Sequence, residues 1–535
     1  MRGRPAWFTS GPEGPLEIDR DASAVWSVVA RVAIAVTALV VIDSVRFADP
    51  DLFVTLYAGR EIAAHHGPPG IDTASFTVAG QPWHDYEWLA RLAMYEVATI
   101  AGDRGLVIGR WLLAATILAT FAMVSARAGG GVPSFATAIA LFVGASSGYL
   151  LFRPTFFTFV ALVLLLAAIE RMRHGARWPL WAIPAAIPVW ANVHAGFALG
   201  IALLGLLVVS GVAERWLPAL GRAFGTGVPV RLSVPCFLAS FALTGVHPLG
   251  YTQWTAVFGT LGGRFTPSIS EWQPLTELTL GGQLPVYLLM AALAAAAFAG
   301  RKRLAAFDVA TALVLGTAAF ARVRFVPLFT LAATLLLLRT LPALGEAASR
   351  STAPVFRVAS KRGARVAGAL AAIGLSGVLA WLFHPNDLRI RKIPVLTPVS
   401  AVKFLQANAI GGRVLAEYDW GGYVRWKIPD STIFVDGRSD TVYPLAVIEE
   451  WARFVNAIGD WRDIAARYRA QVVLLRRDQV VVPLLEHDPE WIAAYGDPFS
   501  GLFIRDVPEN AAFIERLRAG QAVVPVAREE DYLGL

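Results

Sequence analysis

The sequence predicts a polytopic α-helical membrane protein with a C-terminal α/β domain outside the membrane. Three observations lead to this fold class: 56% of the 535 residues are hydrophobic, only 16% are charged, and long apolar stretches recur over the first 383 residues. Soluble domains usually carry about 25% charged residues, so this chain cannot cover a water-facing surface along its whole length. Its 17 tryptophans and 30 phenylalanines exclude a disordered chain. The one cysteine, Cys236, excludes a disulfide framework and a cysteine-based metal site.

Apolar stretches that approach the length of a bilayer span, about 20 residues, predict about eleven membrane-spanning helices. The predicted spans are 26–45, 107–126, 133–149, 154–170, 179–193, 197–213, 232–246, 284–299, 309–322, 325–341 and 366–383. Residues 1–25 are then a cytoplasmic tail, and 26–383 form the transmembrane domain. The first span follows three acidic residues and no small-residue cleavage site, which favours an anchor over a removed signal peptide.

Basic residues in the short connections predict the orientation of the spans. Cytoplasmic loops are rich in Lys and Arg, and a cluster such as Arg301–Arg303 follows the fourth, sixth, eighth and tenth spans. With the N-terminus in the cytoplasm, all these clusters fall on the cytoplasmic side, and an odd number of spans places the C-terminus outside. The net charge of +7 is explained by this pattern, so we expect no nucleic-acid partner.

Two regions are predicted to lie outside the membrane. Residues 46–106 form a long outer loop, whose amphipathic stretches Leu52–His65 and Tyr86–Ile100 are expected to lie along the interface. Residues 384–535 contain frequent, balanced charges and short β-branched runs between helical patterns, which predicts a small α/β domain. Its expected strands are Arg413–Ala416, Thr432–Val435 and Val472–Leu475, and its expected helices are Ser400–Asn408 and Leu445–Ala457.

Ionisable and polar residues gather at the predicted outer ends of the spans. They are Asp49 and Asp51, then His84, Asp85 and Glu87 in "PWHDYEW", Arg153, Asn192, His194, Glu271, Arg322 and Arg324. Charges near the middle of the spans are nearly absent, which disfavours an ion-coupled transporter. Carboxylates and arginines on one membrane face suit chemistry on the phosphate head group of a lipid.

Each of these residues also has a structural interpretation. Asp49 or Asp51 could cap the following helix, and Arg322 and Arg324 could be anchors at the membrane surface. His194, beside Asn192, could be a hydrogen-bonded residue at a helix end. In "DWGGYVRW", Trp420 could be a core residue.

Several stretches resemble the GT-C superfamily of polyprenyl-phosphate-sugar-dependent glycosyltransferases. "ADPDLFVTLYAGREIAAHHG…FTVAGQPWHDYEWLARL" is similar to the first outer loop of lipid A aminoarabinose transferase and protein O-mannosyltransferases. "SISEWQP", which contains Glu271, resembles the SVSE motif of the oligosaccharyltransferase catalytic subunit, and "RVRF" resembles its segment near the donor phosphates. "EYDWGGY" resembles the WWDYG motif, although only Asp419 and Gly421 match. "GASSGYLLFRP" has no counterpart to the second acidic motif, so we expect a GT-C enzyme outside the oligosaccharyltransferase group.

The resemblance implies transfer of a sugar from a polyprenyl phosphate or diphosphate to a glycan, lipid or protein at the outer face of the bacterial cytoplasmic (inner) membrane. The expected catalytic residues are Asp51, its helper Asp49, Asp85, Glu87 and Glu271. The donor phosphate is expected at Arg322, Arg324 and Arg153, and the acceptor at His84, Asn192, His194, Asp419, Trp420 and Tyr423. Mg²⁺ or Mn²⁺ could bind Asp51 and Glu271 through oxygen ligands. Two alternatives stay open: a non-catalytic membrane scaffold with a periplasmic interaction domain, and a ligase or handler of lipid-linked oligosaccharides.

Overall fold

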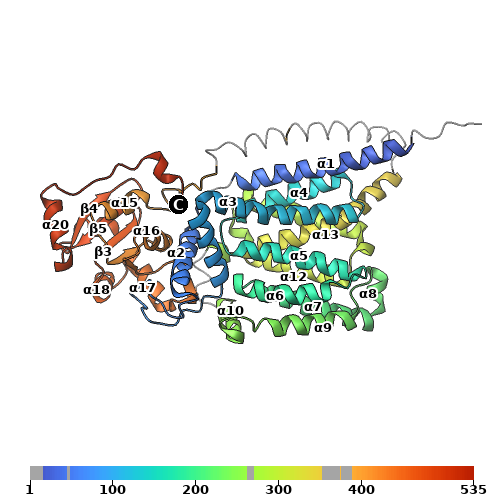
Figure 1. The fold of residues 1–535 in the computed structure, drawn as a ribbon, viewed down its shortest axis with the longest axis horizontal. Helices are drawn as coiled ribbons and strands as arrows, with labels where there is room; N and C mark the ends of the chain where they lie inside the picture. The colour runs from blue at the N-terminus through green and yellow to red at the C-terminus, as the bar shows by residue number, and fades with distance from the viewer. Residues whose placement is uncertain (1–15, 45–47, 262–269, 352–373, 375–387) are drawn as a thin grey trace, which may run out of the picture.

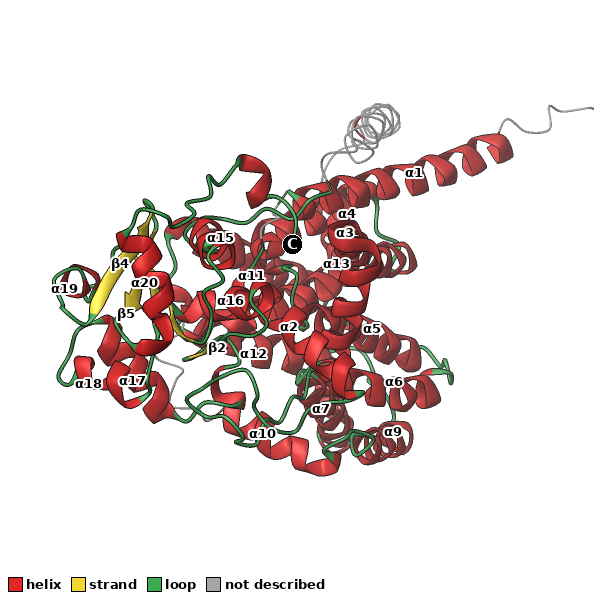
Figure 2. Cartoon of the chain, turned by 60° about the vertical axis from the view of Figure 1, so that its left-hand side comes forward, coloured by secondary structure: helices red, strands yellow, loops and turns green. Residues whose placement is uncertain are grey.

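The computed structural model describes residues 16–44, 48–261, 270–351, 374 and 388–535. Long helices lie side by side in a bundle, and a smaller part with a β-sheet lies against one end of that bundle (Figure 1). Figure 2 shows the same arrangement from another side, with the strands confined to the smaller part. Helix α2 (Pro50–His65) lies where the two parts meet.

The bundle helices follow the predicted apolar stretches. They are α1 (Leu16–Asp43), α3 (Trp88–Arg127), α4 (Val132–Ser146), α5 (Thr155–Arg173), α6 (Pro179–Val193), α7 (Phe197–Trp216), α9 (Val230–Leu243), α11 (Leu280–Ala299), α12 (Ala306–Ala321) and α13 (Val326–Ser351). Among the described residues, seven helices are long and apolar enough to cross a membrane, and α6, α9 and α12 are shorter apolar helices. The predicted span 366–383 lies outside the described residues, so a total of eleven spans stays a prediction.

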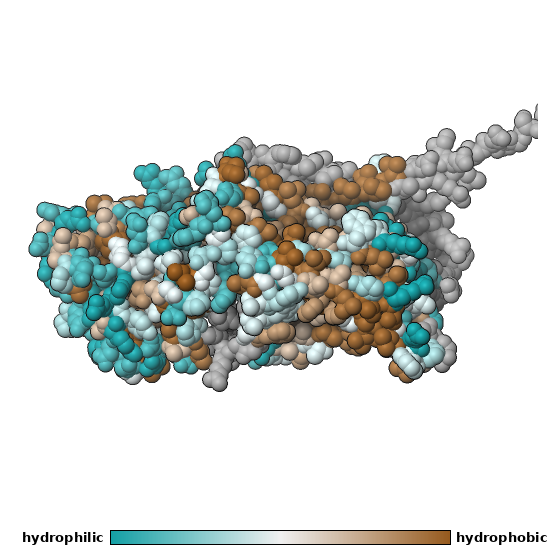
Figure 3. Space-filling view, turned by 60° about the horizontal axis from the view of Figure 1, so that its bottom comes forward, coloured by the Kyte–Doolittle hydropathy of each residue, from teal (hydrophilic) through white to brown (hydrophobic). Residues whose placement is uncertain are grey.

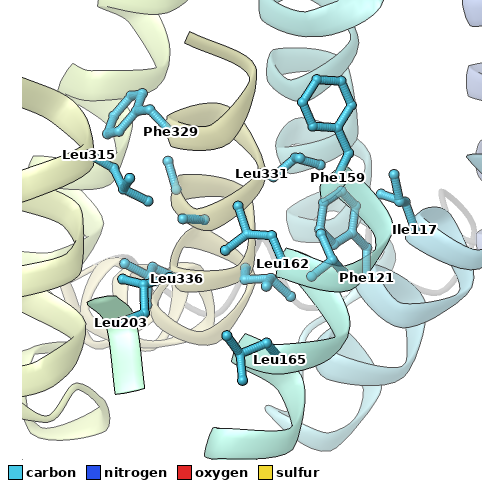
Figure 4. Close-up of a cluster of buried hydrophobic side chains, with 14 of the residues drawn as sticks. Ile117, Phe121, Phe159, Leu162, Leu165, Leu203, Leu315, Phe329, Leu331 and Leu336 are labelled. Atoms are coloured by element: carbon cyan, nitrogen blue, oxygen red, sulfur yellow. The ribbon is translucent and has the colours of Figure 1, made fainter. Parts of the chain in front are cut away.

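Helix α13 is the centre of the bundle. In its most apolar stretch 83% of the residues are buried, compared with 22% in α1 and in α11. Figure 4 shows Leu331 and Leu336 of α13 beside Phe159 and Leu162 of α5. All four side chains are at most 6% exposed. A helix that is apolar on all sides is expected in the interior, whereas α1 and α11 leave apolar side chains such as Val28 and Leu288 exposed. Figure 3 shows apolar residues, in brown, over much of the surface of the bundle.

The first outer loop builds a second layer across the end of the bundle. Gly102 has φ 57° and ψ −150°, which interrupts α3 and lets its first part run crosswise beside α2 (Figure 1). The two helices cross closely, because a Cβ on Gly59 would lie 2.3 Å from the backbone oxygen of Arg91. The sequence predicted that both stretches lie along the membrane surface. Protein covers most side chains of α2, including Leu52, Phe53, Leu56 and Tyr57, so its apolar residues pack in the interior. The position of both stretches along the membrane stays a prediction.

The C-terminal part is a five-stranded mixed sheet with strand order β2-β1-β3-β5-β4. Strand β1 pairs in parallel with β2 and β3, whereas β5 pairs antiparallel with β3 and β4. The elements are α15 (Val399–Ala407), β1 (Arg413–Ala416), α16 (Gly421–Lys427), β2 (Thr432–Ile433), α17 (Leu445–Val455), α18 (Trp461–Arg467), β3 (Val472–Arg476), α19 (Val482–Leu485), β4 (Trp491–Gly496), β5 (Ser500–Arg505) and α20 (Ala511–Arg518). The three predicted strands and two predicted helices are confirmed, while β4 and β5 were not predicted.

One buried group of polar residues joins the C-terminal part to the first outer loop. The Arg438 guanidinium contacts the carboxylates of Asp72 and Asp436, the latter at 2.9 Å, and donates to the Tyr443 hydroxyl at 2.7 Å. Tyr57 of α2 donates its hydroxyl to Asp436. All five side chains are at most 2% exposed. We call these residues the Arg438 network.

The predicted cytoplasmic connections meet at the other end of the bundle. Arg173, at the end of α5, donates to the backbone oxygens of Thr226 at 2.6 Å and Arg303 at 2.8 Å. Arg339 of α13 pairs with Asp308 at 2.9 Å on the same end. These contacts hold three basic connections together, as expected if they share one side of the membrane.

Cysteine labelling tests the orientation. We expect His174→Cys, after α5, to be shielded from an impermeant thiol reagent in intact cells, and Asn456→Cys, after α17, to be labelled. Both residues are exposed in the structure, so membrane side decides the result. The variants are made in a Cys236→Ala background. Labelling of His174→Cys and shielding of Asn456→Cys would reverse the predicted orientation.

Removal of the Arg438 side chain should destabilise the protein strongly. Arg438→Ala leaves Asp72 and Asp436 buried without a cation, and such a loss costs about 3–5 kcal/mol. Arg467→Ala is the matched control, because Arg467 also pairs with two carboxylates but is 49% exposed, where ion pairs contribute about 0–1 kcal/mol. Chemical denaturation in detergent, followed by tryptophan fluorescence, measures both. Equal free energies of unfolding would contradict the structural role of this network.

Candidate functional site

The candidate site lies at the bundle end that faces the C-terminal part. Asp49 is the N-cap of α2, and its side chain accepts a hydrogen bond from the Asp51 backbone N–H. Arg153 lies between η1 (Ser147–Tyr149) and α5. Glu271 belongs to η4 (Ser270–Trp272), and Arg324 belongs to η7 (Val323–Phe325). We call these five residues the Arg153 cluster.

Arg153 connects the three carboxylates of this cluster. Its Nε and Nη2 donate to the two carboxylate oxygens of Asp49 at 2.8 and 2.7 Å. Its Nη1 donates to Glu271 at 2.5 Å, and its Nε lies 3.4 Å from Asp51. Arg324 lies 3.8 Å from the second oxygen of Glu271. The structure therefore brings together residues that are more than 270 positions apart in the sequence.

The carboxylates of the cluster differ in proton affinity. Burial raises the pKa of Asp51 to about 7. The positive charge of Arg153 lowers this pKa, and the negative charges of Asp49, Glu271 and Asp419 offset part of that effect. Burial also acts on Glu271, yet the adjacent Arg153 and Arg324 guanidiniums lower its pKa. Asp51 keeps 41% of its side chain exposed. A carboxylate that is reachable and titrates near neutral pH suits a general base.

The turn before α16 supplies one further acidic side chain. Asp419, in η8 (Tyr418–Trp420), is exposed to solvent. Desolvation by the surrounding protein, together with the charge of Asp49, still raises its pKa. Trp420 is fully buried and donates its Nε1–H to the Val395 backbone oxygen at 3.2 Å. Tyr423 is 3% exposed and packs edge-on against Phe53. Burial of Trp420 and Tyr423 favours the core interpretation over acceptor binding.

Gly437 places the C-terminal part directly against Asp51. A Cβ at this position would lie 2.6 Å from Asp51 Oδ1 and 3.5 Å from a methyl carbon of Val54. Gly437 lies between Asp436 and Arg438, which the Arg438 network holds in place. The network that joins the two parts therefore also positions Gly437, which forms one wall of the candidate site.

A second acidic group surrounds Arg91. Its Nε lies 3.3 Å from Asp85 and its Nη2 lies 3.2 Å from Glu87. Asp85 is 2% exposed, and its burial raises its pKa against the opposing charge of Arg91. His84 is exposed at the surface. The structure thus separates Asp85 and Glu87 from the Arg153 cluster by giving them a different cation.

His194 is a neutral hydrogen-bond donor in this second group. The Gly196 backbone N–H donates to its Nδ1 at 2.9 Å, which assigns the ring proton to Nε2. Nε2 lies 3.3 Å from Glu87. Burial, assisted by the positive charges of Arg324 and Arg91, lowers the pKa of His194 to about 3. The amide of Asn192 is also engaged by the protein, since it accepts from Trp88 Nε1 and donates to two backbone oxygens.

The three predicted phosphate-binding arginines have different surroundings. Arg322 donates to the Trp272 backbone oxygen at 2.7 Å. Arg324 stacks over the Trp272 ring at 5.2 Å and keeps 40% of its side chain exposed. Arg153 is 25% exposed and is surrounded by carboxylates. Arg324 is therefore the most accessible of the three to an anion.

The predicted divalent metal stays a prediction. Within the described residues, no group of three or more His, Cys, Asp or Glu side chains is placed to hold a metal ion. Asp51 and Glu271 both face atoms of Arg153. Sequence reasoning assigned Arg153 to phosphate binding and missed its contacts with the carboxylates; the signal was a lone Arg before Pro154 at the end of a span.

Comparison with known proteins informs the fold. No protein-family model matches the sequence, and no curated protein matches it. Among solved structures, the chain resembles the Archaeoglobus fulgidus oligosaccharyltransferase tethered with an acceptor peptide, with a TM-score of 0.50 and 12% identity over 83% of this chain and 69% of that chain. The apo form of that enzyme aligns with a TM-score of 0.47 and 12% identity, over 90% and 75%. The first likeness shows that this protein shares the fold of that oligosaccharyltransferase.

Proposed function

We propose that the protein is a membrane glycosyltransferase that moves a sugar from a polyprenyl phosphate or diphosphate to an acceptor at the outer face of the bacterial cytoplasmic membrane. The observation that carries this proposal is the Arg153 cluster, where Asp51, a carboxylate with a raised pKa, lies 3.4 Å from Arg153, and Glu271 contacts both Arg153 and Arg324. The GT-C-like fold supports it, because the similar solved structure is an oligosaccharyltransferase. A glycan, a lipid and a protein all stay possible acceptors.

The proposed reaction assigns the base to Asp51. Its carboxylate accepts the proton of an acceptor hydroxyl or amide while the acceptor atom attacks C1 of the sugar. The new bond to C1 forms as the bond from C1 to the phosphate oxygen breaks. The electron pair of the broken bond remains on the polyprenyl phosphate, which leaves with one more negative charge. General-base assistance of this kind contributes about 10²–10⁴-fold.

Arg324 is proposed to hold the donor phosphate. The contacts with Trp272 and Glu271 fix the direction of its side chain, while 40% of that side chain stays exposed. A positioned guanidinium stabilises charge that develops on a phosphate oxygen. No step of this mechanism passes through the Mg²⁺ or Mn²⁺ predicted at Asp51 and Glu271.

The acceptor is proposed to bind near Asp419 and the second acidic group. Asp419 projects from the C-terminal part near Asp49 and Asp51. His194, which lies 3.3 Å from Glu87, is close enough to Arg324 for that positive charge to lower its pKa. An acceptor between these groups would place its nucleophilic atom close to Asp51.

Replacement of Asp51 should separate catalysis from stability. The N-cap of α2 is Asp49, so Asp51→Asn should leave thermal stability nearly unchanged. Loss of the base should lower transfer at least about 10²-fold. Because the base acts when deprotonated, wild-type transfer should rise with pH and level off above an apparent pKa of about 7. The measurement is transfer of labelled sugar from a polyprenyl phosphate by purified protein in detergent.

Asp49→Asn is the matched comparison for this test. Asn caps helices about as well as Asp does, so this variant keeps the cap but weakens the two-oxygen contact with Arg153. We expect a distinctly smaller loss of transfer than in Asp51→Asn, and a pH profile shifted to lower pH, because the charge of Asp49 raises the pKa of Asp51. Near-wild-type turnover by Asp51→Asn would remove this residue from the mechanism. Absence of transfer from every polyprenyl donor would instead favour the scaffold alternative.

A further inference from the structure

Arg153 lies where acidic side chains from two separate segments converge. Asp49 and Asp51 come from the start of α2, and Glu271 comes from η4. Their oxygens lie 2.5 to 3.4 Å from three different nitrogens of the Arg153 guanidinium. The three negative charges raise the pKa of Arg153 further, although burial opposes this effect. Arginine stays protonated in proteins, so this guanidinium supplies a permanent positive charge.

The guanidinium keeps hydrogen-bonding capacity for an anion. An arginine carries five N–H donors, and three of those on Arg153 donate to Asp49 and Glu271. One N–H on Nη1 and one on Nη2 remain. A quarter of the side chain is exposed, so a ligand can reach this group.

A divalent cation does not fit these carboxylates while Arg153 is in place. Mg²⁺ requires oxygen ligands at about 2.0–2.1 Å in an octahedral arrangement. Here one oxygen of each carboxylate lies 2.5 to 3.4 Å from a nitrogen of Arg153, so the guanidinium occupies the position between them that a shared cation would need. A guanidinium supplies the same sign of charge, together with fixed directions for its donors.

We infer that Arg153 is the resident cation of this site and takes the place of a divalent metal. It neutralises Asp49 and Glu271, and its two remaining N–H groups are directed to the phosphate of the donor. The electron pair released at the phosphate oxygen is then stabilised by Arg153 and Arg324. The last step rests on the proposed function, whereas the exclusion of a metal by Arg153 does not.

Manganese binding tests the exclusion directly. Mn²⁺ is titrated into purified protein in detergent, and the electron paramagnetic resonance signal of free Mn²⁺ is measured. We expect no binding by the wild type, and binding of one Mn²⁺ by Arg153→Ala, which frees three carboxylates. Arg462→Gln is the control, because it removes an exposed guanidinium from a single carboxylate, Asp488, which Arg462 contacts at 3.0 Å; it should bind no Mn²⁺. Binding of Mn²⁺ by the wild type at this site, lost in Glu271→Gln, would overturn the inference even if Arg153→Ala fails to fold.

Transfer assays test the catalytic half of the inference. Wild-type transfer should be unchanged by a chelator and by added Mn²⁺ or Mg²⁺. Arg153→Lys keeps the charge but loses the bidentate geometry, and Arg153→Gln loses both. Transfer should therefore fall less in Arg153→Lys than in Arg153→Gln, where we expect a loss of at least about 10²-fold. Loss of wild-type transfer in chelator, restored by Mn²⁺, would contradict the inference. If no donor is used at all, the proposed function fails, while the Mn²⁺ titration still decides the metal question.

Discussion

The buried Arg438 guanidinium determines how the two parts of this protein meet. It binds Asp72 of the first outer loop and Asp436 of the C-terminal part, while Asp436 also accepts the hydroxyl of Tyr57 on α2. Buried charged side chains require partners that pair and hydrogen-bond with them, so the residues of the Arg438 network tolerate little displacement. Because Gly437 follows Asp436 directly, the same constraint sets the distance between the C-terminal part and Asp51. The candidate site therefore depends on the Arg438 network, although none of the residues of the Arg153 cluster belongs to that network.

Local patterns were sufficient for most elements of the fold. Apolar length located the bundle helices, and β-branched runs located β1, β2 and β3. Strand β4 was not predicted because its "WIAAYG" sequence contains two alanines, which have a low β-propensity, and because its side chains do not alternate regularly between buried and exposed positions. The buried position of α2 was also missed. Its apolar side chains would suit a lipid surface equally well, and only the presence of α16 and α3 decides between the two environments.

The candidate site was predicted in its members but not in its internal pairing. The sequence predicted that Asp49, Asp51, Arg153, Glu271 and Arg324 lie at one membrane face. The structure brings these five residues together. Which carboxylate faces which cation depends on the packing of distant helices, and topology alone contains no such information. Arg91 pairs with Asp85 and Glu87, while Arg153 pairs with Asp49, Asp51 and Glu271. Trp420 and Tyr423 belong to the core, because aromatic side chains beside a strand end fill interior space as readily as they line a binding site.

The separation of 366 residues between Asp72 and Arg438 has a consequence for biosynthesis. Translation proceeds from the N-terminus at about 5–20 residues per second, so the first outer loop emerges long before its cation does. During that interval Asp72 and Tyr57 lack the partner that buries them, and α2 lacks the C-terminal surface that covers its apolar side chains. The loop can acquire its final form only after the C-terminal part has been made. The end of the bundle that holds the candidate site is thus completed last, when Arg438 reaches its carboxylates.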